Sequence, residues 1–184
     1  MNTGVVSKRF AKALLMYSLQ QGKETQVYEE VKTLAHNYYE VPKLRKAVGN
    51  PVLEKSRKLA LLQEAAGGKG VSNEFMRFFE LVLDDKRESF LQFMLWSFID
   101  QYRQKKNIRV GKLTTAIESP KLVAELEKLV GKGTGSTVEL TTVIDPSIIG
   151  GFIIELSGYR MDASMASQLA RVKGEFIARN RRIV

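Results

Sequence analysis

Apolar residues in the first 106 positions recur at intervals of three and four, the spacing that places side chains on one face of an α-helix. The first stripe predicts a helix over about residues 4–20, and it consists of Val6, Phe10, Ala13, Leu14 and Tyr17. A second stripe, between Val27 and Tyr38, predicts a helix that continues to about Glu40. Gly22 separates the two helices, because glycine readily adopts the backbone conformation that ends a helix.

Four further helical segments are predicted before residue 106. Pro42 begins a short basic one, and residues 59–66 mark another that ends at a cluster of glycines. Ser72 is predicted to cap the next helix, because its hydroxyl can accept a hydrogen bond from a first-turn amide. That helix has the clearest stripe, formed by Phe75, Phe78, Phe79, Val82 and Leu83. The last helix, over about 89–106, is rich in aromatic residues, and the short connections between all these helices indicate a bundle.

The pattern changes after residue 106 to short β-branched segments separated by helical ones. The predicted order is β-α-β-β-α, with strands over 108–115, 137–143 and 151–156, a short extra strand over 159–161, and helices that begin at Ser119 and Ser164. The sequence therefore predicts an α+β protein that is mainly α. We expect a helical bundle over residues 1–106 followed by a small α/β domain over residues 107–184.

Composition is that of a soluble globular chain. Hydrophobic residues make up 44% and charged residues 27% of the 184 positions, enough to build a core. No apolar run approaches the roughly 20 residues that cross a bilayer, and the N-terminus has no signal-peptide pattern, so we expect no direct membrane insertion. The absence of cysteine excludes disulfides, thiolate zinc sites and cysteine nucleophiles.

The net charge of +9 raises the alternative of an RNA-binding protein. Basic residues are spread along the chain, however, with 18 Lys and Arg against 12 Asp and Glu in residues 1–106, and 11 against 8 in the rest. The densest basic groups are Arg103, Lys105, Lys106, Arg109 and Lys112, and the tail Arg171, Lys173, Arg179, Arg181 and Arg182. Without interleaved aromatics these groups indicate a solvated helix face and a basic C-terminus, and we expect no nucleic-acid partner.

No catalytic motif fits the chain. A phosphate-binding loop must follow a strand and precede a helix, whereas the glycines of 67–69 and 131–136 follow predicted helices. His36, the only histidine, lies mid-helix without a second ligand for a metal. Asp84 and Asp85 stand beside basic residues at a helix corner and indicate a solvated charge cluster. We therefore predict no catalytic, cofactor-binding or metal-binding residues.

The segment 144–164 combines a proline turn, paired glycines that permit positive φ, and a helix start with polar capping residues. A turn, a hairpin and a cap explain all of these residues without a function. The segment also resembles the C-terminal signature of the delta subunits of bacterial ATP synthases, the counterparts of the mitochondrial oligomycin-sensitivity-conferring protein. The matching positions are Asp145, Ser147, Ile148, Ile149, Gly150, Gly151, Gly158, Asp162 and Ser164. Ala163 departs from the family's usual glycine, which affects the expected turn geometry.

The N-terminal half resembles the same family. Residues 9–14, Arg-Phe-Ala-Lys-Ala-Leu, are similar to the family's Arg-Tyr-Ala-Lys-Ala-Leu opening, with Phe10 in place of Tyr. Asn50-Pro51 and the charged corner at 84–88 also fall where the family has a break and a bend. The resemblance thus extends over essentially the whole chain in one order.

The resemblance implies a non-catalytic stator subunit of a proton-translocating rotary ATP synthase. In this family a six-helix N-terminal bundle holds the N-terminal helix of an alpha subunit of the catalytic head, and the C-terminal domain receives the C-terminal end of the membrane-anchored b subunit. Such a subunit keeps the head from turning with the rotor, binds neither nucleotide nor protons, and has no cofactor. It lies peripherally at the cytoplasmic face of the bacterial inner membrane.

The family's use of its first and fifth helices leads us to expect an alpha-subunit groove on this chain. Its predicted residues are Phe10, Ala13, Leu14, Tyr17, Phe75, Phe79 and Val82. The b-subunit contact is placed only within residues 145–184. A general helical adaptor that holds some other helix stays as a further alternative, because an amphipathic groove does not name its occupant.

Overall fold

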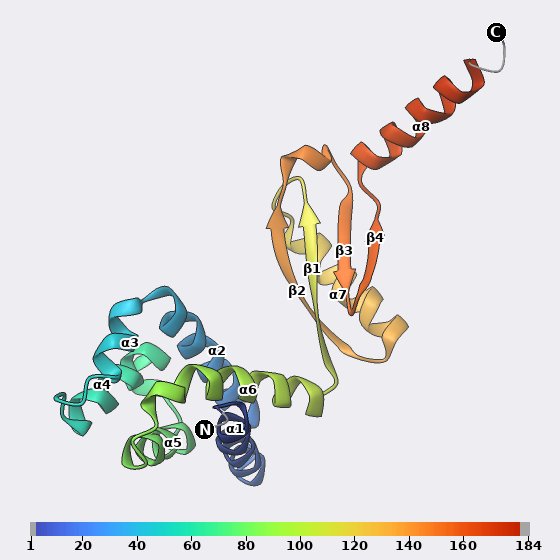
Figure 1. The fold of residues 1–184 in the computed structure, drawn as a ribbon. Helices are drawn as coiled ribbons and strands as arrows, with labels where there is room; N and C mark the ends of the chain where they lie inside the picture. Colours follow the sequence, from blue (N-terminus) through green and yellow to red (C-terminus); the bar gives the residue numbers. More distant parts are fainter. Residues whose placement is uncertain (1–2, 181–184) are drawn as a thin grey trace. The chain divides into compact units, whose positions relative to one another are not determined.

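The computed structural model describes residues 3–180, and the chain divides between Lys105 and Lys106 into two compact units (Figure 1). The first unit is helical and the second carries a four-stranded mixed sheet, so the predicted mainly helical α+β class is confirmed. Among the residues described, no helix is long and apolar enough to cross a bilayer.

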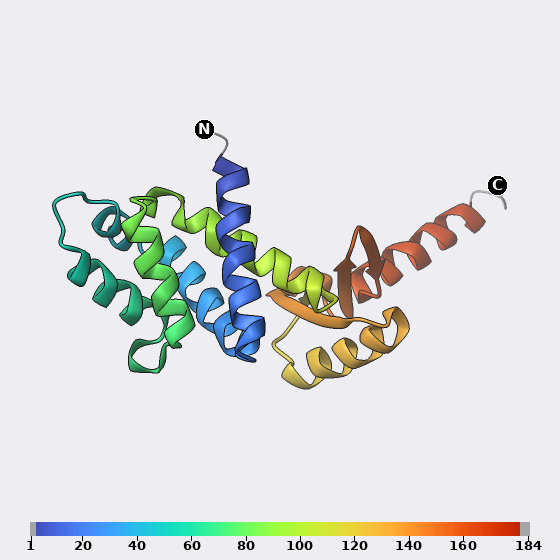
Figure 2. The same ribbon diagram turned by 90° about the horizontal axis from the view of Figure 1, so that it is seen from below.

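Six α-helices form the first unit within the described residues, as the apolar stripes and the family resemblance predict. They are α1 (Thr3–Gln20), α2 (Glu24–Glu40), α3 (Pro42–Val48), α4 (Lys55–Ala66), α5 (Asn73–Asp84) and α6 (Leu91–Lys105), with the 3-10 turns η1 (Gly68–Gly70) and η2 (Glu88–Phe90). In Figure 2, α6 lies against α1 and α2, with α5 beside α1.

Aromatic and aliphatic side chains from all six of these helices are buried. Phe75 and Phe79 of α5 and Phe98 of α6 are completely buried, because their stripes face the neighbouring helices. Tyr28 of α2 stacks on Tyr102 of α6 with ring centroids 4.2 Å apart. Removal of this much aromatic surface from water is the main source of the bundle's stability.

The second unit follows the predicted β-α-β-β-α order. Its elements are β1 (Ile108–Thr115), α7 (Pro120–Thr134), β2 (Thr137–Ile144), η3 (Pro146–Ile148), β3 (Phe152–Leu156), β4 (Tyr159–Asp162) and α8 (Met165–Asn180). The sheet order is β2-β1-β3-β4, in which β1 and β2 are parallel and the other pairs antiparallel. The α7 crossover covers one face, and Leu113, Leu126 and Ile154 form the core between helix and sheet.

One local prediction is wrong. Ser72 does not cap α5 with its side chain, because its hydroxyl donates instead to Glu30 of α2 at 2.6 Å. A residue distant in sequence therefore takes the hydroxyl. In the second unit, α7 continues through Gly131 and Gly133 to Thr134 and ends at Gly135, where φ is 61°.

Candidate functional site

A shallow groove runs between α1 and α5, which lie antiparallel. The hydroxyl of Tyr17 is 2.8 Å from Arg77, and Lys23 beyond the end of α1 pairs with Glu74 at 3.5 Å. The groove has a volume of about 170 Å³ and a mainly apolar lining, formed by Ala13, Leu14, Tyr17, Glu74, Arg77, Phe78 and Leu81. We call this surface the α1/α5 groove.

The structure brings only part of the predicted groove together. Ala13, Leu14 and Tyr17 line the groove, whereas Phe10 lies half-buried with its ring 5.6 Å from the Arg87 guanidinium.

The predicted α5 residues point into the core instead. Phe75, Phe79 and Val82 are at most 1% exposed and lie in the bundle core, so they do not line the groove in this structure. The groove-facing residues of α5 lie on the adjacent row, at Phe78 and Leu81. Leu81 is 48% exposed. In the sequence, an apolar residue that stands three positions after Phe78 but outside the core stripe was the feature that could have indicated an exposed groove residue.

In the family-signature segment, short-range hydrogen bonds hold the chain in place before α8. The side chain of Asp145 accepts from the Ser147 amide at 2.9 Å, and the Met165 amide donates to the Gly150 carbonyl at 2.9 Å. Ile149 has φ of 68°, an unusual value for a β-branched residue, and its side chain is exposed. Hydrogen bonds from Ser147 hold the pKa of the Asp145 carboxyl below its ordinary value.

Gly151 is required by the space around it. Its φ is 74°, and a Cβ there would lie 2.2 Å from the Ala163 carbonyl oxygen. Asp162 and Ser164 then begin α8 as predicted: Asp162 accepts from the Ser164 amide at 2.9 Å, and Ser164 accepts from the Ser167 amide at 3.3 Å.

Gly158, the remaining glycine of the signature, lies at the turn between β3 and β4. Its φ is 86° and that of Ser157 is 51°, a pair of positive values typical of tight hairpin turns. The signature residues therefore shape the connection between the sheet and α8.

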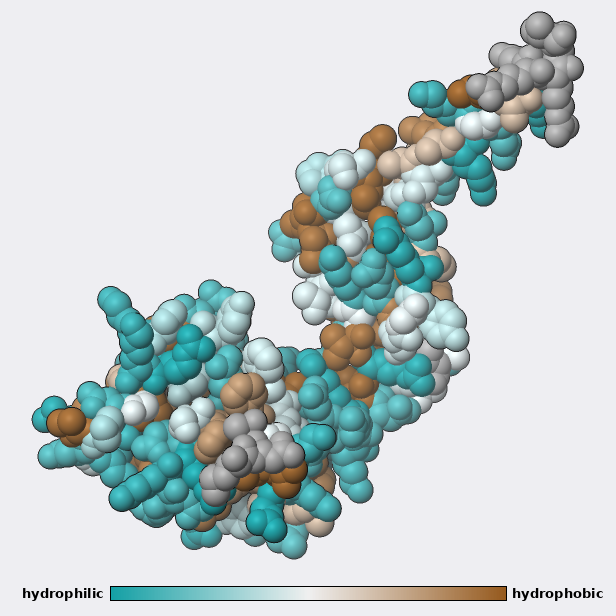
Figure 3. All heavy atoms as spheres, in the orientation of Figure 1, coloured by the Kyte–Doolittle hydropathy of each residue, from teal (hydrophilic) through white to brown (hydrophobic). Residues whose placement is uncertain are grey.

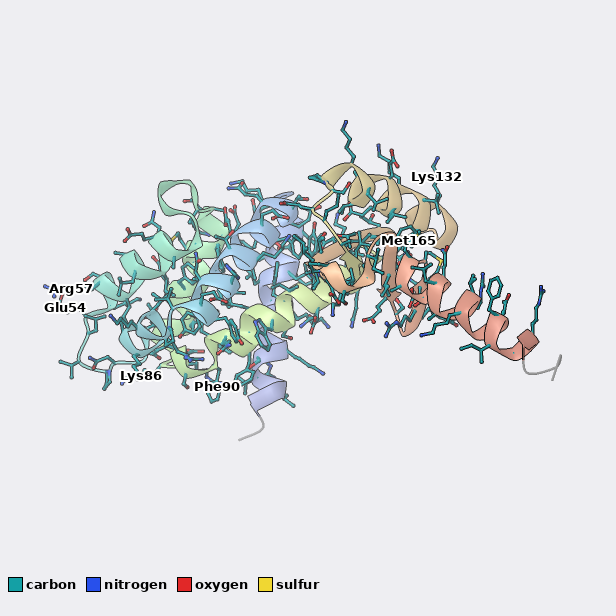
Figure 4. The ribbon with its side chains drawn as sticks, turned by 90° about the horizontal axis from the view of Figure 1, so that it is seen from above. Glu54, Arg57, Lys86, Phe90, Lys132 and Met165 are labelled. Atoms are coloured by element: carbon teal, nitrogen blue, oxygen red, sulfur yellow. The ribbon has the colours of Figure 1, made fainter. Side chains whose placement is uncertain are left out.

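An exposed apolar stripe runs along one side of α8. Its side chains are 45–67% exposed, and they are Met165, Leu169, Val172, Phe176 and Ile177. In Figure 3 brown and pale residues lie among teal ones along α8, and Met165 stands at the start of the helix in Figure 4. Within the described residues α8 packs mainly against η3. Arg181 and Arg182 of the predicted basic tail lie outside the described residues.

Residues 3–180 contain no group of three His, Asp or Glu side chains placed to hold a metal ion. His36 is exposed on α2. Asp84 pairs with Lys55 at 2.5 Å, and Asp85 is exposed at the end of α5. The α1/α5 groove and the α8 stripe are both largely apolar surfaces.

Comparison with known proteins agrees with the resemblance seen in the sequence. Residues 6–176 match the family described as ATP synthase delta (OSCP) subunit. A protein named ATP synthase subunit delta from Phocaeicola vulgatus is 53% identical over 185 residues, covering 100% of both chains. Its namesake from Bacteroides thetaiotaomicron is 47% identical, again covering 100% of both chains.

A solved structure shares the fold. A chain in the cryo-EM structure of the Toxoplasma gondii mitochondrial ATP synthase hexamer superposes with a TM-score of 0.61 at 18% identity, covering 93% of this chain and 97% of that one. The family match over residues 6–176 and the identity to relatives over their full length show that the chain belongs to the ATP synthase delta (OSCP) subunit family.

Proposed function

We propose that this chain, as a peripheral-stalk subunit of an ATP synthase, links the catalytic head to the b-subunit stalk without catalysing a reaction itself. The observation that carries the proposal is that each unit presents an exposed apolar surface, the α1/α5 groove in the first and the α8 stripe in the second. A joint between two partners needs two such surfaces, and no reactive group is required at either.

The α1/α5 groove suits the N-terminal helix of an alpha subunit. Ala13 is small and exposed, so a helix backbone can approach α1 closely there. Leu81 is exposed for apolar contact, above Leu14 and Phe78, which line the groove but are at most 6% exposed. An amphipathic helix laid in such a groove buries side chains at i, i+3, i+4 and i+7. The revised groove therefore keeps Ala13, Leu14 and Tyr17 and takes Phe78 and Leu81 from α5.

The α8 stripe suits the C-terminal end of the b subunit. Met165, Leu169, Val172 and Phe176 are spaced four, three and four apart, the spacing of a seam between two helices. Arg171, Lys173 and Arg179 flank the stripe against the single acid Glu175, which favours an acidic amphipathic helix as the partner. Of the region 145–184 given above for this contact, residues 181–184 lie outside the described part.

The experiment is co-purification of tagged chain with the alpha and b subunits from membranes. Leu81→Asp is expected to lose alpha and keep b, whereas Leu169→Asp is expected to lose b and keep alpha. Each introduces one charge on an exposed position, so folding is retained, and Leu129→Asp on α7, 70% exposed and in neither surface, is the matched control. Retention of both partners by all three variants would refute the two-surface proposal.

The same experiment bears on location. We place the protein at the cytoplasmic face of the bacterial inner membrane, held there through its partners, so loss of both contacts should release it from the membrane fraction.

Phe79→Asp is unsuitable as a groove variant, because Phe79 is completely buried and a charge there would unfold the bundle.

A further inference from the structure

We infer that Arg77, positioned by Tyr17, binds a carboxylate on the helix that occupies the α1/α5 groove, and so sets the direction in which that helix lies. This inference rests on the proposed function. Arg77 comes from α5 and Tyr17 from α1, and the Nη1 of Arg77 donates to the Tyr17 hydroxyl at 2.8 Å across the groove. The pair is part of the groove lining.

Arg77 has unused binding capacity. A guanidinium carries five N–H donors, and among the described residues the neutral Tyr17 hydroxyl is its one acceptor. No described carboxylate lies within 4.0 Å of it. Glu74, the acid in the groove lining, has a side chain only 8% exposed and pairs with Lys23. Arg77 is thus an exposed cation without a counter-charge beside an apolar surface.

The opposite end of the helix pair has a different character. That end carries charges of both signs: Arg87 lies over the Phe10 ring, Asp84, the last residue of α5, pairs with Lys55, and Asp85 stands beside Lys86. Because cations there already have acidic neighbours and Arg77 has none, a partner carboxylate gains more at the Arg77 end. Phe10 and Tyr17 are seven residues apart on α1, about 10 Å along a helix, so the two ends are about two turns apart.

The partner helix that fits these features has apolar residues at three- and four-residue spacing over about two turns and an Asp or Glu at one end only. The carboxylate accepts from Arg77 in the paired geometry that guanidinium and carboxylate groups favour. Tyr17 is a positioning residue, because its hydroxyl holds the guanidinium over the groove and does not itself carry charge.

The test uses a labelled synthetic peptide with the N-terminal sequence of the cognate alpha subunit, titrated with the full chain at low and high salt. Arg77→Gln is expected to weaken binding by about tenfold at low salt and by less at high salt, since charge-assisted contacts are screened. Arg57→Gln is the matched control. Arg57→Gln makes the same charge change on α4, a helix that does not line the groove. There Arg57 pairs with Glu54 at 3.9 Å (Figure 4).

Peptides with each Asp or Glu replaced singly by its amide identify the contact. One replacement should weaken binding to the wild-type chain and leave binding to Arg77→Gln unchanged, which defines the pair. If Arg77→Gln binds every peptide as Arg57→Gln does while Leu81→Asp abolishes binding, the inference is overturned and the groove stands. If Leu81→Asp also binds normally, the groove itself is refuted.

Discussion

Glu30 on α2 has 8% of its surface exposed, yet its carboxylate is well supplied with donors. It accepts from the Ser72 amide at 2.9 Å, from the Ser72 hydroxyl at 2.6 Å and from Gln26 at 2.9 Å. A buried charge is stable where such donors replace water. Glu30 therefore ties α2 to the residue before α5, the helix that lines the groove.

Replacement of Glu30 by alanine should lower the free energy of unfolding by about 1–3 kcal/mol, because the buried Ser72 donors lose their acceptor. Urea denaturation followed by circular dichroism measures the change. Glu29→Ala is the neighbouring control, since Glu29 is exposed and its carboxylate pairs with the exposed Lys32 at 3.5 Å. Equal stability of the two variants would show that the Glu30 contacts contribute nothing.

Asp162, the last residue of β4, should have a pKa below the ordinary value of an aspartate. Hydrogen bonds from Ser164, and then from Ser167, lower the pKa of its carboxyl. A lowered folded-state pKa stabilises the native state above the unfolded value of about 3.9, and this contribution is lost as the pH falls through the folded value. Ser167→Ala should move the Asp162 titration, followed by NMR, upward. An unchanged midpoint would exclude the Ser167 hydroxyl as a cause.

At the scale of elements, the helices and strands were predictable because their apolar spacing is local. The apolar stripe of α5 and the β-branched residues of β1 identify each element before any packing is known. The Ser72 cap was not predictable in the same way, since its hydroxyl is taken by Glu30, 42 residues away in sequence. The face of α5 that stays open was missed for a similar reason, because it depends on which neighbours cover the other faces.

The junction between the sheet and α8 depends on one glycine. Gly151→Ala should lower the unfolding free energy by at least about 2 kcal/mol, because alanine disfavours positive φ and its Cβ would meet the Ala163 carbonyl. Gly133→Ala on α7 is the control, since its Cβ would meet nothing within 4 Å and alanine favours a helix. The midpoint temperature of thermal unfolding should therefore fall for Gly151→Ala and rise for Gly133→Ala.

At the scale of the whole molecule, each unit contains its own core and its own candidate surface. Phe75, Phe79 and Phe98 lie in the first unit, and Leu113 with Leu126 in the second. The prediction of separate domains at residues 1–106 and 107–184 can therefore be tested by asking whether a fragment folds alone. Two units that fold independently would let one molecule hold two partners without one contact straining the other.

A fragment of residues 1–105 should keep a helical circular dichroism spectrum and unfold cooperatively, because the bundle's buried aromatics all come from it. It should also bind the alpha-subunit peptide as the full chain does. Gradual unfolding without a transition would mean that the bundle depends on the second unit. The matching measurement on full-length chain provides the reference.

The order and kind of the elements followed from sequence alone, and so did the family, because stripes, turn residues and the spacing of Asp145, Gly151 and Asp162 are written along the chain. Tertiary packing decided which side of each stripe is buried. Phe79 and Leu81 are two residues apart on one helix, yet the first is completely buried and the second half exposed, since burial depends on the helices around α5. Periodicity identifies an apolar face, but only the neighbours determine which part of it stays open to a partner.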